Sequence, residues 1–274
     1  MAKQERDTGT GDLIAYVENG VGVAIMNRPE RRNALSPAML AALAQTLADF
    51  ETDSEVGCVV LTGAGGAFCA GGDVKGMAEA NAGGRTIDID SRIHLQRLSQ
   101  RATAGKLHTM PKPTLAAIGG AAAGAGLALA LACDLRIAAD NAVMTTAFAR
   151  VGFSGDYGGT YFLSRLVGAA KAREFYYLSE RLDMAEAARL GLVNWVVPAD
   201  RLKAKTFEIA DRLAKGPRVA YRYMKENINR AGTGNWEECM DLEATHHIHT
   251  GLTEDHREAA KAFVEKREPA FKGR

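Results

Sequence analysis

Two short runs of small residues, FCAGGD at residues 68–73 and GGAAAGAG at residues 119–126, decide the fold of this chain. Each run follows an apolar segment typical of a buried strand and leads into a segment typical of a helix. A loop at the start of a helix carries backbone N–H groups without intrahelical acceptors, so two such loops can hold an oxyanion between them. Neither run has the lysine of a phosphate-binding loop or a set of metal ligands. The two runs therefore predict a site for a carbonyl oxygen that becomes negative during a reaction.

The composition is that of a globular protein with room for one large domain or two small ones. Of the 274 residues, 47% are hydrophobic and 24% are charged, and the net charge is +1. A charge so near neutral argues against a nucleic-acid partner. No stretch reaches about 18 apolar residues, and the N-terminus resembles neither a signal peptide nor a transit peptide. The four cysteines lack C-x-x-C spacing, as expected of reduced thiols. We therefore expect a cytoplasmic protein without a membrane partner.

The order of the expected elements predicts an α/β fold. The strand–loop–helix module occurs twice, and each small-residue loop lies at the carboxyl end of its strand, where α/β proteins bind ligands. Strands are expected at residues 13–17, 21–26, 58–61, 113–118, 134–138, 143–145 and 193–197, and helices at about 36–50, 91–108, 127–132, 159–166, 169–178 and 183–191. The first two strands should form a hairpin through an Asn19–Gly20 turn, and Ser36 and Asp183 should cap the helices that they precede.

Three parts of the chain differ in character. Residues 1–10 are polar and are expected to form a flexible N-terminus, and residues 11–199 form the core with the site. Residues 200–274 carry helical patterns without a strand signal, including an apolar stripe with Leu202, Phe207 and Leu213. We expect this last part to be a helical region for self-association, because we do not expect the core of one chain to absorb so much apolar surface.

Several motifs occur in a characteristic order. They are NRPE at 27–30 with RNAL at 32–35, FCAGGD at 68–73, GAG at 124–126 ending in ACDL at 132–135, YGGT at 157–160, Ala187 with GLV at 191–193, and AFVEKR at 262–267. With them the chain resembles the enoyl-CoA hydratase/isomerase family, the crotonase superfamily, over about residues 12–272. The resemblance implies a spiral of ββα units and a C-terminal α-helical trimerisation region. It also implies a homotrimer or a hexamer built as a dimer of trimers, acting on acyl-CoA thioesters without a metal or a redox cofactor.

The resemblance also implies where the oxyanion binds. The donors should be the backbone N–H groups of Gly72 and Ala125, which occupy the matching positions of the two small-residue runs. Ala125 replaces the usual glycine, and this requires a negative φ at that position. Losing one such donor typically costs about 3–4 kcal/mol of transition-state stabilisation.

Residues that contact the coenzyme A part of the substrate follow from the same resemblance. Tyr157 is expected to line the acyl pocket. A neighbouring subunit should contribute Phe263 and Lys266, although Phe263 could equally be an interface core residue. Asp73 could instead cap a short helix. The contacts expected from the chain itself are Arg28, Arg32, Ala34, Ala70, Asp73, Val74 and Lys75.

The acid–base residues depart from the hydratase pattern. The resemblance implies that hydratases of the family use two carboxylates to handle one water molecule. The two matching positions here hold Ala128 and Phe148. One acid, Asp156, matches the aspartate of the family's double-bond isomerases, and burial against an apolar acyl pocket would raise its pKa. We expect an enoyl-CoA isomerase in which Asp156 moves the proton. A plain helix cap is the alternative role for Asp156.

Three other functions remain open at this point. The chain could still be an enoyl-CoA hydratase. It could be a hydrolase or dehalogenase that uses Asp156 as a nucleophile, or a non-catalytic binding protein. His246, His247, His249 and His256 have helical spacing, but no carboxylate or cysteine set accompanies them, so we expect no metal site. Asp134 is expected to be a structural acid at the start of a strand.

Overall fold

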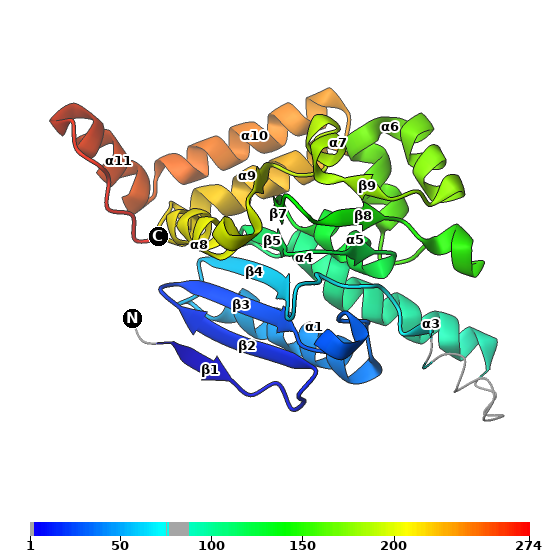
Figure 1. The fold of residues 1–274 in the computed structure, drawn as a ribbon. Coiled ribbons are helices and arrows are strands. Elements are labelled where there is room, and N and C mark those ends of the chain that lie inside the picture. Colours follow the sequence, from blue (N-terminus) through cyan, green and yellow to red (C-terminus); the bar gives the residue numbers. More distant parts are fainter. Residues whose placement is uncertain (1–2, 75, 77–87) are drawn as a thin grey trace.

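A seven-stranded mixed sheet forms the centre of the molecule (Figure 1). The computed structural model describes residues 3–74, 76 and 88–274. In spatial order the strands are β1 (Gln4–Arg6), β2 (Leu13–Glu18), β3 (Val21–Met26), β4 (Cys58–Gly63), β5 (Thr114–Ile118), β7 (Leu135–Ala139) and β10 (Trp195–Val197). The first three strands pair antiparallel, and the pairs from β3 to β10 are parallel.

The N-terminal hairpin follows the sequence prediction. Strands β2 and β3 are joined at Asn19 and Gly20, which have φ values of 52° and 83°. A two-residue turn with both φ values positive matches the twist of the flanking strands and favours Asn-Gly. Strand β1, which lies in the segment expected to be a flexible N-terminus, was not predicted. Its residues are all exposed, so it has no apolar pattern, and it is defined only by pairing with β2.

Helices cover both faces of the sheet. Val59 and Leu61 of β4 join the core cluster that includes Phe50 of helix α1 (Pro37–Thr52). Cys58 and Val60 point to the opposite face, where they pack with Ala210 of helix α8 (Leu202–Ala214). This alternation is the period-two pattern of a strand buried on both sides.

The small-residue run at 119–126 forms a second, smaller sheet and a buried helix. Strand β6 (Ala122–Ala123) pairs with β8 (Val143–Thr145), which pairs with β9 (Leu182–Asp183). Helix α5 (Ala125–Ala132) follows β6 directly, and all of its residues are buried. Strands β6 and β9 are only two residues long, and we did not predict them because such short elements carry no periodicity.

The remaining elements of the core agree closely with expectation. The predicted helix at 91–108 is α3 (Ile89–Gln100), a π-helical stretch η2 (Arg101–Gly105) and α4 (Lys106–Thr109). The two helices expected at 159–178 form one element, α6 (Gly159–Leu178), broken at Gly168. Helix α7 (Met184–Arg189) is capped by the predicted Asp183 side chain. Short 3-10 turns complete this part: η1 (Pro29–Arg31), η3 (Phe148–Val151) and η4 (Ala199–Arg201).

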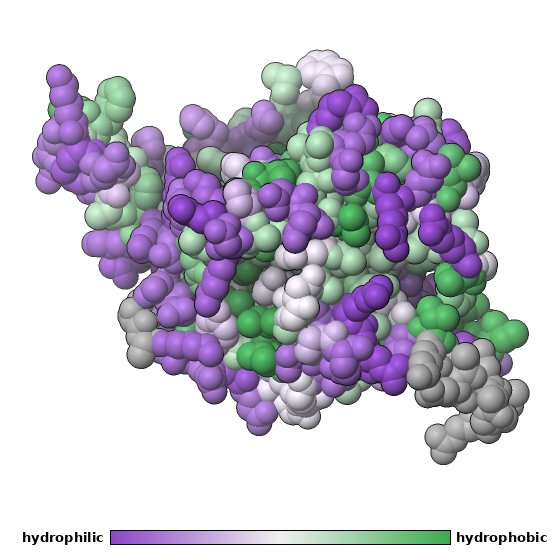
Figure 2. All heavy atoms as spheres, viewed as in Figure 1, coloured by the Kyte–Doolittle hydropathy of each residue, from purple (hydrophilic) through white to green (hydrophobic). Residues whose placement is uncertain are grey.

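The C-terminal part is helical, as predicted. Helix α8 packs on the sheet, followed by α9 (Arg218–Ala231), α10 (Trp236–Gly251) and α11 (Glu254–Glu265), which extends from the body (Figure 1). Large apolar side chains are exposed on these last three helices, such as Ile228, Trp236 and Phe263. In Figure 2 a few green side chains stand out on the mainly purple arm at the upper left. No helix of the described part combines the length and the apolar character needed to cross a membrane.

An ion pair fastens α9 to the core. The Lys225 ammonium group is buried and lies 2.9 Å from Asp134 Oδ2. It also donates to the carbonyls of Leu107 and Lys112, at 2.9 and 3.2 Å. The same Asp134 oxygen accepts from the Thr114 N–H at 2.8 Å, so Asp134 joins two strands and a helix. The expected structural role of Asp134 is consistent with these contacts.

We expect Lys225→Met to destabilise the fold by about 3 kcal/mol, because it leaves the Asp134 carboxylate and two carbonyls without their cation. Arg222→Met on the same helix is the matched control. Arg222 pairs with Glu226 on the surface, at 2.9 Å, and such pairs contribute about 0.5 kcal/mol or less. Denaturant unfolding measures both variants. Equal losses in the two would show that the buried pair has no special role.

Candidate active site

The two small-residue loops lie directly against each other. The N–H groups of Phe68 and Cys69 donate to the Ala121 carbonyl, both at 3.0 Å, and the Ala123 N–H donates to the Cys69 carbonyl at 2.9 Å. Loops separated by some 50 residues in the sequence are thus held together through their backbones. This brings together the two segments that the sequence analysis placed at one site.

Glycine is required where these backbones touch. A Cβ atom at Gly126 would lie 2.3 Å from the Cys69 carbonyl oxygen, and one at Gly120 would lie 2.0 Å from the Gly66 carbonyl oxygen. No real Cβ contact is so short, so a methyl group at either position would push the loops apart. The small-residue composition of both runs therefore follows from close backbone packing.

The N–H of Ala125 has no acceptor within its own helix. Ala125 is the first residue of α5, and the turn closes only with the Ala128 N–H, which donates to the Gly124 carbonyl at 3.0 Å. Ala125 is not among the residues with positive φ, as its side chain requires, whereas Gly124 before it has a φ of 53°. A Cβ at Gly71 would lie 3.4 Å from the Ala125 nitrogen. The Gly71–Gly72 turn therefore borders the start of α5.

Asp156 lies in the turn before α6 with a carboxylate that is not used as a helix cap. The Gly159 N–H donates to the backbone carbonyl of Asp156 at 3.0 Å, and Gly158, the N-cap residue, makes no side-chain capping bond. The buried Oδ1 atom of Asp156 has no hydrogen-bond partner among the described residues. Burial raises the pKa of this carboxyl to about 6. The helix-cap alternative for the Asp156 side chain is therefore wrong.

The charge of Asp156 influences titratable groups of the first small-residue loop and of α6. Burial raises the pKa of the Cys69 thiol to about 12, and the Asp156 charge adds to that rise. Burial also raises the pKa of Tyr176 on α6, again with a contribution from Asp156. The charge of one partly buried carboxylate thus acts both on the first small-residue loop and on α6.

Apolar groups occupy the two positions where the hydratase pattern has acids. Ala128 and Phe148 are buried, and the Phe148 ring stacks on Tyr176 with ring centroids 5.7 Å apart and planes 8° from parallel. A Cβ at Gly159 would lie 3.1 Å from the Ala128 Cβ, so the turn after Asp156 packs on α5. The small cavity bounded by these groups has no carboxylate among its described lining residues.

Arg28 and Asp73, both predicted to contact the substrate, bind each other. Arg28 Nη2 lies 3.0 Å from Asp73 Oδ2, and Nη1 donates to the Ala34 carbonyl at 2.8 Å. The second oxygen of Asp73 accepts from the Gly76 N–H at 3.0 Å, as a helix cap would. This bond, with help from Arg28, lowers the pKa of Asp73. The pair ties the 28–36 segment to the first small-residue loop.

The other predicted substrate contacts fall into two places. Arg32 and Val74 have exposed side chains, Ala34 is buried, and the Ala70 N–H donates to the Arg32 carbonyl at 2.9 Å. All four border the loop pair, whereas Lys75 lies outside the described residues. Phe263 and Lys266 are on and directly after α11, at the opposite end of the molecule from α3 (Figure 1). The chain does not bring these two residues to its own loop pair.

Tyr157 is buried, and its side chain points to α3. Its hydroxyl lies 3.2 Å from Ser99 Oγ, and its N–H donates to Gln100 Oε1 at 2.9 Å. Tyr157 therefore links the turn that carries Asp156 to the end of α3.

Asn33 is an organising residue that the sequence analysis did not single out. It is fully buried in a left-handed conformation, with φ 58°. Its amide nitrogen donates to the carbonyls of Ala64, Ala67 and Phe68 at 2.8–3.3 Å, and its oxygen accepts from the Arg28 N–H. Asparagine suits such a position because it tolerates positive φ. Its place within the RNAL motif at residues 32–35 was the signal that the sequence offered.

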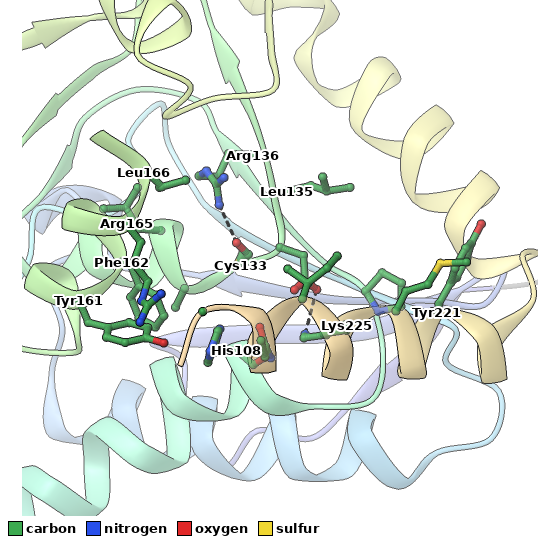
Figure 3. Close-up of a pocket in the computed structure, with 18 residues that line it drawn as sticks. His108, Cys133, Leu135, Arg136, Tyr161, Phe162, Arg165, Leu166, Tyr221 and Lys225 are labelled. Atoms are coloured by element: carbon green, nitrogen blue, oxygen red, sulfur yellow. Dashed lines mark hydrogen bonds and ion pairs between the residues drawn. The ribbon is translucent and has the colours of Figure 1, made fainter. Parts of the chain in front are cut away.

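A larger cavity, of about 450 Å³, lies at the other end of α5 between α6 and α9 (Figure 3). Asp156, Gly72 and Ala125 do not line it. Lys225 there pairs with Asp134, and Arg136 donates to the carbonyls of Leu192 and Cys133. These cations serve the fold, and the cavity is distinct from the predicted site.

The histidines of α10 do not form a metal site in the described part of the chain, which contains no suitable group of His, Cys, Asp or Glu side chains. His246 is buried, bonds to Asn227 through Nδ1 at 2.6 Å and packs on the Tyr223 ring. It joins α9 to α10.

Comparison with known proteins shows to which family the chain is similar. Residues 16–274 match the family model described as enoyl-CoA hydratase/isomerase. The chain is 35% identical to the 1,2-epoxyphenylacetyl-CoA isomerase of Escherichia coli, covering 96% of this chain and 98% of that protein. It is also 35% identical to the short-chain-enoyl-CoA hydratase of Clostridium acetobutylicum, over 96% and 98% of the two chains.

A solved structure, an enoyl-CoA hydratase from Bacillus anthracis, superimposes with a TM-score of 0.88 at 33% identity, covering 96% of this chain and all of that one. The fold expected from the motifs, a crotonase-type α/β core followed by a helical region, is confirmed. The chain therefore belongs to the enoyl-CoA hydratase/isomerase family of enzymes, the crotonase superfamily.

Proposed function

We propose that this chain acts on acyl-CoA thioesters and shifts a carbon–carbon double bond of an enoyl-CoA. One observation carries the proposal: the partly buried Asp156 carboxylate has no hydrogen-bond partner for Oδ1 among the described residues and lies in a turn that packs on α5, while Ala128 and Phe148 occupy the positions of the hydratase acids. One carboxylate suffices to take a proton from one carbon and return it to another.

In the proposed reaction, the thioester carbonyl of a 3-enoyl-CoA accepts hydrogen bonds from the Gly72 and Ala125 N–H groups. Asp156 removes a proton from C2, and the electron pair of that C–H bond moves into a dienolate whose oxygen carries the negative charge. The two N–H groups stabilise this charge. Asp156 then gives the proton to C4, and the double bond ends between C2 and C3. Atoms and charge balance without a metal or a redox cofactor.

The names of relatives point to acyl-CoA substrates but to different reactions. The Escherichia coli relative is named an isomerase of an epoxyphenylacetyl-CoA, and the Clostridium acetobutylicum relative is named an enoyl-CoA hydratase. Hydration is therefore the second candidate. Hydratases of the family use two carboxylates, and the two matching positions here hold Ala128 and Phe148, whose ring stacks on Tyr176. This packing favours the isomerase.

Binding of the coenzyme A part is proposed to use the exposed side chains of Arg32 and Val74 and the half-buried Ala70 around the loop pair, while Tyr157 lines the acyl pocket. Phe263, which is 87% exposed, and Lys266 would complete the nucleotide site from a neighbouring copy. The proposed assembly is a homotrimer or a dimer of trimers. Sedimentation velocity should show one of these species, and a stable monomer at micromolar concentration would refute the shared site.

The dependence of kcat/KM on pH, on the acid side of the profile, gives a direct test. Since Asp156 has a pKa of about 6 and must be ionised to accept a proton, kcat/KM for a 3-enoyl-CoA should rise with pH through about 6 and level off above it. The absorbance of the conjugated 2-enoyl product follows the reaction between pH 5 and 8. No conversion at any pH, or a rate independent of pH, would contradict the proposal.

A further inference from the structure

The turn that carries Asp156 is held from outside by the end of α3. Gln100, the last residue of α3, accepts a hydrogen bond from the Tyr157 N–H at 2.9 Å. This N–H belongs to the peptide bond between Asp156 and Tyr157. Ser99, one residue earlier, lies 3.2 Å from the Tyr157 hydroxyl. Two consecutive side chains of α3 therefore contact Tyr157, the residue that follows Asp156.

The backbone held in this way is strained. Tyr157 has a φ of 48°, a left-handed conformation that bulky residues rarely adopt. Gly155 and Gly158 on either side also have positive φ, but glycine takes such values without strain. Strained residues persist only where their surroundings hold them, and they gather at functional sites. The contacts from Gln100 and Ser99 are such surroundings.

The helix changes its winding directly after these two residues. The π-helical stretch η2 begins at Arg101, and the hydroxyl of buried Thr103 donates to the Ser99 carbonyl at 2.8 Å. Short π-helical turns often occur at functional sites because they re-aim neighbouring side chains. The end of α3 is thereby fixed to the core at the point where it contacts Tyr157.

Asp156 has no comparable support of its own. Its buried Oδ1 atom has no hydrogen-bond partner among the described residues. The direction of such a carboxylate depends on the backbone that carries it. We propose that Gln100 is a positioning residue for Asp156, because its carboxamide oxygen fixes the Asp156–Tyr157 peptide bond and so directs the carboxylate at the substrate. The inference rests on the proposed role of Asp156 as the base.

Three variants test this inference. Gln100→Leu removes the acceptor, Gln100→Glu keeps an acceptor oxygen but adds a charge near Asp156, and Gln45→Leu on the surface of α1 is the matched control. We expect Gln100→Leu to lower kcat by roughly 10- to 100-fold with little change in KM, because misplacing a reacting group by about 1 Å has effects of this size. Gln45→Leu should behave as the wild type.

The Gln100→Glu variant gives two readouts: recovery of the plateau activity, which tests whether the kept acceptor oxygen is what matters, and a pH shift, which tests whether position 100 lies near Asp156. A second carboxylate should make Asp156 harder to ionise, so the acid limb of the kcat profile should move up by about one pH unit, with most of the activity kept on the plateau. Cys69, Tyr157 and Tyr176 are the titratable groups whose pKa values Asp156 affects, and all three pKa values are raised by burial. These groups stay neutral between pH 5 and 8, so the limb reports on Asp156.

Each outcome separates this inference from the proposed function. A wild-type kcat in folded Gln100→Leu, or an unmoved acid limb in Gln100→Glu, overturns the positioning role even if Asp156→Asn is inactive. Full activity in Asp156→Asn overturns the proposed base and this inference with it. If Gln100→Leu fails to fold, the pH profile of Gln100→Glu still decides.

Discussion

Asp156→Asn should abolish the double-bond shift while leaving binding of the CoA thioester nearly unchanged. Asparagine has almost the same shape but cannot accept the substrate proton, so kcat should fall by ~10³-fold or more. Calorimetric binding of an unreactive acyl-CoA should give a Kd close to that of the wild type, because the N–H groups of the loop pair remain. A variant that retains full turnover would show that Asp156 is not the base.

The same substitution should stabilise the fold at neutral pH. The folded-state pKa of Asp156 is about 6, above its ordinary value of 3.8, so the native state holds the proton more tightly than the unfolded chain. The stability contributed by protonated Asp156 is fully present below pH 3.8 and is lost as the pH rises through about 6. Removing the charge should therefore raise stability at pH 7.5 by about 1–2 kcal/mol, and the gain should vanish near pH 4. A loss of stability at pH 7.5 would indicate a structural role.

Gly126→Ala should damage turnover through the backbone. The new methyl group would lie 2.3 Å from the Cys69 carbonyl oxygen, so the first loop must move away from the start of α5. This changes the separation of the Gly72 and Ala125 N–H groups, and we expect kcat to fall by ~10²- to 10³-fold, the usual effect of losing one oxyanion donor. Overpacking should also cost about 1–3 kcal/mol of stability.

Gly251→Ala is the control for this variant. Gly251 is also helical, and a Cβ there would meet nothing within 4 Å. Alanine favours a helix over glycine by about 1 kcal/mol, so this variant should be slightly more stable and fully active. If Gly126→Ala behaves in the same way, the loops tolerate separation and the oxyanion assignment is wrong.

Local rules in the sequence predicted most of the core. The Asn19–Gly20 turn, the Ser36 cap of α1 and the Asp183 cap of α7 are short-range signals, and each is confirmed. The small-residue runs also predicted that the two loops share one site, and the backbone bonds between the loops, which the sequence analysis did not foresee, bring them together. Strands β6 and β9 escaped prediction because two residues cannot show a period.

The site was predicted in part, because side-chain partners depend on the fold. The family resemblance favoured Asp156, but a capping role could be excluded only when the structure showed no side-chain capping bond at the start of α6. The Arg28–Asp73 pair joins residues 45 positions apart, and Gln100 is 57 positions from Tyr157. No local sequence pattern reveals such pairs. No local pattern could show either that α11 places Phe263 far from the two small-residue loops of the same chain.

Mass analysis of the products formed from a 3-enoyl-CoA and, separately, from a 2-enoyl-CoA tests the central claim most directly. The account predicts that the 3-enoyl-CoA is converted to a 2-enoyl-CoA of unchanged mass, and that the 2-enoyl-CoA does not gain water at a comparable rate. Efficient addition of one water to the 2-enoyl substrate, with no shift of the double bond in the other, would contradict it and require a second acid that the account does not contain.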